Sequence, residues 1–230
     1  MFLRPRVAIL GRFSKKASAI RFGEVLSARE LVELVELVEL VWTAGGEPIT
    51  YLPVPDRDWS FGLQGVDAVL LPGGGDIDPA CYGGEVHSEV YDVDVLQDQS
   101  DFDLTEAALA TGIPVLGVCR GMHILNVFKG GSLVEHMQDP HRHMVQNVAI
   151  PESAGLGIVG DITISCYHHQ AIREPGEGIE VTARAGDGTA EAISIIGAGW
   201  CKGVQWHPED TWRNDPDQLS LMREFLAQVY

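Results

Sequence analysis

The stretch VLGVCRGMHILN, residues 115–126, joins an apolar run to a helical pattern through a cysteine that stands between two glycines. Gly117 precedes Cys119 by two residues, and Gly121 follows it by two. This G-x-C-x-G arrangement is typical of a nucleophile elbow, a sharp turn from strand to helix that raises a reactive side chain above a sheet. We therefore interpret Cys119 as a nucleophile whose thiolate is favoured by the start of the helix. The alternative is a buried structural cysteine.

Strand and helix patterns alternate on both sides of this turn. Apolar runs predict strands at 6–11, 48–53, 66–72 and 113–118, and helical patterns cover 27–44, 101–111, 120–129 and 216–229. Such alternation predicts a mainly parallel sheet with helices on both faces. After about residue 145 short strand patterns follow one another, and we expect them to extend the same sheet in an antiparallel manner. No linker interrupts the chain, so we expect a single domain over residues 1–230.

The composition excludes several classes of protein. A formal net charge of -17 over 230 residues argues against nucleic acid and against an anionic membrane surface. The four cysteines are widely spaced without a CxxC pair, which argues against a disulfide framework or a zinc site made of thiolates. There is no signal-peptide pattern and no apolar segment near the ~20 residues of a membrane span. We expect a reduced, cytoplasmic protein.

A thiol with a pKa near ~8.5 needs a base to act as a nucleophile at neutral pH. His207, in GVQWHPED (203–210), is the strongest candidate among eight histidines. It ends an apolar strand, and Glu209 two residues later can project to the same side of an extended backbone. A Cys119–His207–Glu209 triad requires that orientation and no particular order along the chain. The alternative for His207 is a surface histidine at the end of a strand.

A third element is the glycine run in LLPGGGD, residues 70–76. A strand that ends in Gly73, Gly74 and Gly75 exposes backbone N–H groups at the edge of the sheet where sites of α/β proteins lie. Together with the N–H of Arg120, these groups are candidates for an oxyanion hole. A phosphate-binding loop is disfavoured because no GK[ST] follows, and an ordinary turn is the alternative.

Four motifs in this order, PGGGDIDP, GVCRGMHILNVFKGGSL, SCYHHQ and GVQWHPE, resemble the class I glutamine amidotransferase-like family. Within it the chain is most similar to the gamma-glutamyl-gamma-aminobutyrate hydrolases, from about Arg6 to the closing helix. The resemblance implies a flavodoxin-like α/β three-layer sandwich. It also implies hydrolysis of a gamma-glutamyl amide through a thioester on the cysteine nucleophile, with no metal and no cofactor. The products would be glutamate and an amine, which the sequence does not identify.

The resemblance also assigns residues. Cys119 matches the nucleophile, His207 the general base and acid, and Glu209 its orienting carboxylate, while the glycine loop and the amide of Arg120 match the oxyanion donors. The positions that line the glutamyl site are Tyr167, His168, His169 and Gln170. One position departs from the pattern, because His123 stands where relatives commonly have Gln. An alternative for His168 and His169 is a pair held at a strand end by hydrogen bonds to the backbone.

Three other interpretations stay open at this point. The chain could be a glutaminase subunit that passes ammonia to a separate synthetase chain, or a non-catalytic binding protein on the same scaffold. A metal site built from His141 and His143 with His168 or His169 is weakly supported, because no ligand spacing accompanies it. The helix over 27–44 repeats Glu at 30, 33, 36 and 39, which leaves a broad Leu/Val surface for the core and for a subunit contact. We therefore also consider a homodimer.

Overall fold

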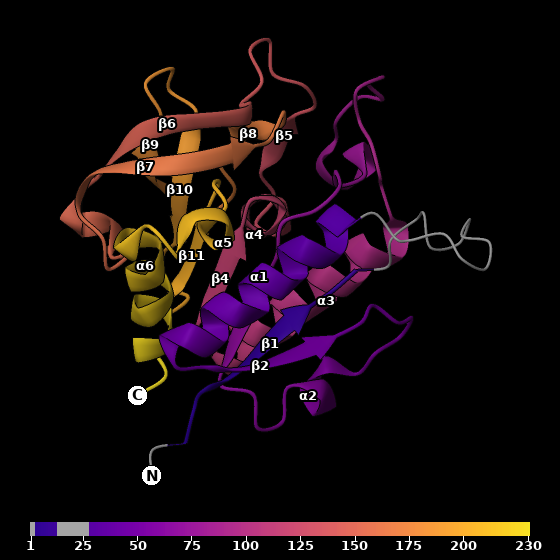
Figure 1. The fold of residues 1–230 in the computed structure, drawn as a ribbon. Coiled ribbons are helices and arrows are strands. Elements are labelled where there is room, and N and C mark those ends of the chain that lie inside the picture. The colour runs from indigo at the N-terminus through magenta and orange to yellow at the C-terminus, as the bar shows by residue number, and fades with distance from the viewer. Residues whose placement is uncertain (1–2, 13–27) are drawn as a thin grey trace.

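The structure, a computed structural model, describes residues 3–12 and 28–230, and its centre is a seven-stranded sheet in the order β2-β1-β3-β4-β11-β10-β9 (Figure 1). These strands are β1 (Arg6–Leu10), β2 (Glu47–Tyr51), β3 (Ala68–Leu71), β4 (Val115–Val118), β9 (Ile179–Arg184), β10 (Ala190–Ile195) and β11 (Cys201–Val204). Five neighbouring strands of this sheet run parallel, namely β2, β1, β3, β4 and β11. The strands β10 and β9 are added antiparallel at the edge next to β11. The predicted mainly parallel sheet with an antiparallel extension is confirmed.

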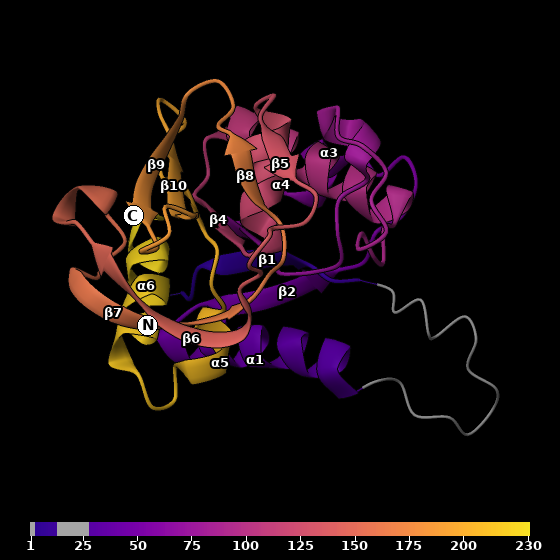
Figure 2. The ribbon, with the colours of Figure 1, turned by 90° about the horizontal axis from the view of Figure 1, so that it is seen from above.

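Helices cover both faces of this sheet. Seen from above, α1, α5 and α6 lie on one side, and α3 and α4 lie on the other (Figure 2). The helices are α1 (Ala28–Ala44), α2 (Trp59–Gly62), α3 (Val95–Thr111), α4 (Arg120–Phe128), α5 (Pro208–Thr211) and α6 (Pro216–Ala227), with 3-10 turns η2 (Pro79–Tyr82) and η3 (Glu152–Ala154). In the part of the chain described, none of these helices combines the length and the apolar character that crossing a membrane requires.

The helix α3 begins six residues before the predicted start at 101. Asp94 caps it, because its carboxylate accepts hydrogen bonds from the backbone N–H groups of Leu96 and Gln97 at 3.0 and 3.2 Å. The first turns are rich in polar residues, so the apolar pattern that marked the helix in the sequence starts only later.

The alternation of side chains along the strands builds two separate cores. In β1, Val7 and Ile9 belong to the core beneath α1 and α6, whereas Ala8 and Leu10 belong to the core beneath α3 and α4. Successive residues of a strand point to opposite faces, and here all four are fully buried. A continuous apolar run is therefore required of a strand that is covered on both sides.

Four strands after residue 130 do not join the central sheet. The strands β5 (Ser132–Val134) and β8 (Ala171–Glu174) pair with each other, and β6 (Arg142–Ile150) pairs with β7 (Gly160–Tyr167). The expectation that the late strands extend one sheet is wrong for β6 and β7, and β5 and β8 were not predicted as strands. A period-two pattern specifies that a strand has two unlike faces but does not name its partner. The parallel strand β11 also differs from that expectation, because it lies beside β4.

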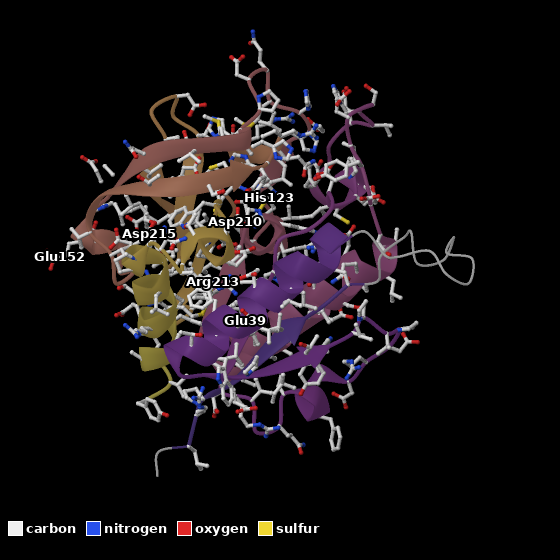
Figure 3. All side chains as sticks on the ribbon, viewed as in Figure 1. Glu39, His123, Glu152, Asp210, Arg213 and Asp215 are labelled. Atoms are coloured by element: carbon white, nitrogen blue, oxygen red, sulfur yellow. The ribbon has the colours of Figure 1, made fainter. Side chains whose placement is uncertain are left out.

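The helix α1 packs its apolar side against the core and leaves part of its surface uncovered. Leu37, Leu40 and Val41 are buried, while Trp42 is half exposed. The carboxylates of Glu36 and Glu39 are bound by Arg213, which lies beside Glu39 on the outer face of the molecule (Figure 3). The side chains at positions 30 and 33 are outside the described part of the structure. The subunit contact on this helix remains a prediction.

The turn from β4 to α4 depends on glycine at two positions. A Cβ on Gly117 would lie 2.6 Å from the backbone carbonyl carbon of Gly121, and a Cβ on Gly121 would overlap the carbonyl oxygen of Leu71 at the end of β3. The first turn of α4 is therefore in direct contact with the backbone of two neighbouring strands. A side chain at either position would have to push backbone apart, which a packed interior resists.

We expect Gly121→Ala to lower the free energy of unfolding by about 2–4 kcal/mol, because the added methyl group overlaps backbone atoms of β3. Urea denaturation measures this change. The matched control is Gly186→Ala, since a Cβ at Gly186 meets nothing within 4 Å. Equal stability of the two variants would contradict the role of this close approach.

Candidate active site

Three neighbouring strands end at one place, where the predicted site residues gather. Gly73 follows β3, Cys119 follows β4, and His207 follows β11, and these strands are adjacent and parallel in the sheet. The carboxyl ends of parallel strands meet at the same edge, which is where α/β proteins place their sites. The fold therefore brings together residues that are far apart in the sequence.

Cys119 occupies a strained backbone conformation at the end of β4. Its φ of 50° and ψ of -103° are rare for a residue with a side chain. Its backbone N–H donates a hydrogen bond to Val204 O at 2.7 Å, and its carbonyl accepts from the N–H of Met122 at 3.0 Å. The turn is thus held by β11 on one side and by α4 on the other. The residue as a whole is 8% exposed.

His207 is held in place by Glu209. The carboxylate accepts a hydrogen bond from His207 Nδ1 at 2.7 Å, and both residues are almost completely buried. Pro208 begins the short helix α5 directly after the histidine, which brings Glu209 back toward the ring. The contact expected between these two side chains is therefore present, but the extended backbone predicted for it is wrong, because Glu209 lies in α5. The contact leaves Nε2 of the ring available to Cys119, whose negative charge helps to raise the pKa of His207.

The charge of His207 is set by competing effects. Burial alone would lower the pKa of this imidazole, but the negative charge of Glu209, assisted by Cys119, raises the pKa well above its usual value of 6.5. An imidazolium in contact with the cysteine stabilises a thiolate, because each charge is buried beside its opposite. The arrangement thus favours the protonated, positively charged form of His207.

Gln205 is a site residue that the sequence analysis missed. Its side-chain nitrogen donates to Cys119 Sγ at 3.7 Å, and its oxygen accepts a hydrogen bond from His123 Nε2 at 2.7 Å. Burial lowers the pKa of His123 to about 4, so this ring is a neutral donor. His123 thus reaches Cys119 through Gln205. Gln205 directly follows β11, and its place at the carboxyl end of an apolar strand could have indicated it.

The glycine loop lies against the other site residues. A Cβ on Gly73 would lie 2.7 Å from His207 Cε1, and a Cβ on Gly74 would lie 2.7 Å from Arg120 Cδ. Gly75 instead faces the backbone of Asp92. The absence of side chains at Gly73 and Gly74 lets the loop approach His207 and Arg120. This proximity is what an oxyanion hole shared with the Arg120 amide would require, and that role stays a prediction.

The side chain of Arg120 turns to two buried carboxylates. Its guanidinium pairs with Asp98 and Asp101, both on α3, and all three side chains are almost fully buried. Two carboxylates around one guanidinium compensate its positive charge, so this charge does not act on a substrate. Its contribution to the site is therefore the position of its backbone at the start of α4.

The SCYHHQ segment places its four predicted residues in different environments. The ring of Tyr167 lies 5.3 Å from that of His207, edge to face. His169 Nε2 donates to Asp76 at 3.0 Å, which ties this segment to the glycine loop. Gln170 donates to Tyr82 Oη at 3.5 Å. His168 Nδ1 donates to the carbonyl of Gln170 at 2.9 Å, in keeping with the backbone-bonded alternative.

A second cysteine also lies near histidine and glutamate, and it differs from Cys119. Cys166 Sγ is close to His168 and Glu191, but Cys166 is completely buried. Burial, with the charge of Glu191, raises the pKa of its thiol to about 12. Such a thiol is unreactive at neutral pH because the thiolate is the nucleophile. Cys119 is therefore the better candidate for a nucleophile.

The family follows from comparison with known proteins. The sequence model of Peptidase C26 matches residues 18–209. A protein of Mycobacterium tuberculosis, whose name assigns it provisionally to the glutamine amidotransferases, is 37% identical over 200 residues, which are 81% of this chain. The chain spans 63% of that relative's length. The chain belongs to the Peptidase C26 family, within the class I glutamine amidotransferase-like proteins, which are cysteine-dependent hydrolases and amidotransferases.

Two further likenesses are informative. A gamma-glutamyl-gamma-aminobutyrate hydrolase of Escherichia coli O157:H7 is 32% identical over 179 residues, which cover 69% of each protein. The crystal structure of a glutamine amidotransferase from Thermotoga maritima has a TM-score of 0.64 and 14% identity, over 99% of each chain. At that identity the second likeness supports the fold alone.

We expect the pKa of His207 to fall in Glu209→Gln, because the amide removes the negative charge that favours the imidazolium. The measurement is an NMR titration of the imidazole nitrogens. Asp210→Asn is the matched control, since the carboxylate of Asp210 bonds Ser165 Oγ at 2.8 Å. The interpretation fails if the two variants change the titration of His207 equally.

Proposed function

We propose that the chain hydrolyses a gamma-glutamyl amide through a thioester on Cys119 and releases glutamate and an amine. The observation that carries the proposal is the strained turn at Cys119, which lies at the end of the strand next to the one that leads to His207, whose ring Glu209 orients through a hydrogen bond of 2.7 Å. The likeness to a protein named gamma-glutamyl-gamma-aminobutyrate hydrolase supports the choice of the gamma-glutamyl group.

The proposed reaction has two halves. The thiolate of Cys119 attacks the gamma-carbonyl carbon, and the C–N bond breaks as His207 gives its proton to the departing amine. Backbone N–H groups of the glycine loop and of Arg120 stabilise the oxyanion; the loss of one such donor typically costs ~3 kcal/mol of barrier. Water then attacks the thioester with His207 as the base. The thiolate leaves and glutamate is released.

Arg142 is the cation that we assign to the α-carboxylate of the substrate. Its guanidinium is exposed and lies 5.6 Å from the centre of the Tyr91 ring. The Tyr91 ring lies 5.4 Å from that of His169, which bonds Asp76 at the end of the glycine loop, so this cation lies on the side of the candidate site where the glycine loop is. A cation at this position would attract a carboxylate in a protein whose net charge is -17.

A second candidate is a glutaminase that delivers ammonia to a separate synthetase chain. It is favoured by the Mycobacterium tuberculosis relative, whose name points to the glutamine amidotransferases. The two functions differ in substrate preference: a glutaminase prefers glutamine, whereas a gamma-glutamyl-amine hydrolase prefers amides of larger amines. A panel of gamma-glutamyl amides that includes glutamine separates them.

Cys119→Ala is expected to reduce hydrolysis of the best substrate in this panel by about 10⁴-fold or more, because the covalent pathway is lost. Intact mass spectrometry after rapid acid quenching should detect one glutamyl group on the wild-type protein and none on the variant. Cys201→Ala, which removes another buried thiol, is the control and should retain activity. Full activity of Cys119→Ala would refute the thioester mechanism.

Arg142→Met is expected to raise KM for gamma-glutamyl amides by about 10-fold with a smaller change in kcat, because a charged hydrogen bond to the substrate contributes about 1.5–3 kcal/mol. Steady-state kinetics measure both constants. Arg184→Met, at an exposed arginine on β9, should leave them unchanged. An unchanged KM in Arg142→Met would show that another group holds the carboxylate.

A further inference from the structure

Four side chains from distant parts of the sequence meet behind the candidate active site. They are His141, Cys166, His168 and Glu191, and all four are buried. One potential ligand atom from each lies within 4.8 Å of the others. His141 precedes β6, Cys166 is near the end of β7, His168 follows β7, and Glu191 is on β10. The cluster therefore joins the β6–β7 ribbon to the central sheet.

The local backbone aims these side chains inward. Cys166 and His168 flank Tyr167, which points to His207, so these two neighbours face the opposite side. The pairing of β9 with β10 shifts register around Glu191, between Ala190 and Ala192. Such bulges re-aim side chains. The four residues thus converge through specific features of three strands.

Two atoms of the cluster lack partners. His168 Nε2 and Glu191 Oε2 are buried and form no hydrogen bond. His168 is only 4% exposed, and its Nε2 points at the carboxylate of Glu191 from 3.9 Å. Burial of a polar atom without a partner is unfavourable, and native proteins rarely leave one unexplained. A ligand that accepts electron pairs would satisfy both atoms.

The two histidines are oriented as metal ligands are. His168 donates through Nδ1 to the carbonyl of Gln170 at 2.9 Å, and His141 Nε2 lies 3.0 Å from a carboxylate oxygen of Asp187. In each ring the other nitrogen is directed into the cluster. A ring nitrogen bonded to a carbonyl or carboxylate, with its opposite nitrogen free, is the usual outer arrangement of metal-bound histidine.

We propose that His141 Nδ1, Cys166 Sγ, His168 Nε2 and the Glu191 carboxylate bind one Zn²⁺ ion in a closed structural site. Four protein ligands of nitrogen, sulfur and oxygen match tetrahedral zinc, and a site without an open position is structural, not catalytic. Zinc bonds of about 2.0–2.3 Å separate the ligand atoms by roughly 3.3–3.8 Å. His141 Nδ1 and Glu191 Oε1 are already 3.4 Å apart.

Charge balance favours a divalent cation at this position. A thiolate and a carboxylate together carry two negative charges, which a divalent ion neutralises. Both residues, Cys166 and Glu191, are fully buried, so two anions are unfavourable here without a cation.

Gln146 competes with the ion for the same atoms. Its side-chain nitrogen lies 3.1 Å from His141 Nδ1, 3.5 Å from Cys166 Sγ and 3.0 Å from Glu191 Oε1. An amide has two hydrogens and cannot serve three acceptors fully. Gln146 is partly exposed, so it can swing outward when an ion binds. This competition separates a metal site from a cluster held only by hydrogen bonds.

The test is titration of the full-length protein, first treated with a chelator, with Co²⁺ as a spectroscopic substitute for Zn²⁺. We expect one Co²⁺ per chain, visible bands of tetrahedral geometry, a sulfur-to-cobalt charge-transfer band, and displacement by Zn²⁺. Cys166→Ser should lose the charge-transfer band, while Cys201→Ser should keep it. The absence of these bands in the wild-type protein would overturn the proposal.

Two further variants have effects of opposite sign. Asp187→Asn should weaken Zn²⁺ binding by about 10–100-fold, because it removes the carboxylate that orients His141. Gln146→Ala should strengthen it by a few fold and enlarge the rise in Tm on adding Zn²⁺. Cys119→Ala should bind Zn²⁺ as the wild type does, so the metal site and the proposed hydrolysis succeed or fail separately. A charge-transfer band that persists in Cys166→Ser would also refute this ligand set.

Discussion

The contact of α4 with the ends of β3 and β4 is the constraint on which the site depends. Gly121 lies against Leu71 O, and Gly117 lies against the backbone of Gly121, so the helix can begin immediately after the strand. The strained conformation of Cys119 persists because backbone on both sides over-determines it. The same approach brings the glycine loop to Arg120. Contacts between backbone atoms thus determine where the sulfur lies, independently of the other side chains of the site.

Around this turn the site is assembled from hydrogen bonds that each fix one orientation. Glu209 fixes His207, and His123 fixes Gln205, which in turn contacts the sulfur. Every member of these two chains is buried, so their electrostatic interactions are stronger than they would be in water. The neutral chain through His123 and the charged chain through His207 approach the same atom. Two separate pairs of hydrogen-bonded residues therefore hold the surroundings of the proposed nucleophile in place.

The sequence predicted the features that depend on local pattern. The parallel core, its covering helices and the turn at Cys119 follow from apolar runs, periodicity and glycine spacing. The ribbon of β6 and β7 could not be predicted, because an alternating pattern does not identify the strand's partner. The cluster of His141, Cys166, His168 and Glu191 was missed for a related reason: its members lie on or next to three different strands, and no spacing within one segment indicates them. The metal site considered from the sequence included His143, which is close to His141 in the chain, and it lacked Cys166 and Glu191, which are far from it.

The strands of the β6–β7 ribbon pair with each other and take no part in the ladder of the central sheet, and Ser165 O on β7 accepts a hydrogen bond from His207 N at 3.1 Å. Insertions, deletions or exchanges in its connecting turn would leave the hydrogen bonding of the seven strands intact. Yet Tyr167, at its end, touches the ring of His207. Substitutions in this ribbon can therefore change the surroundings of the reacting bond without altering the central sheet. Proteins that share the sheet can in this way differ in the molecules that they accept.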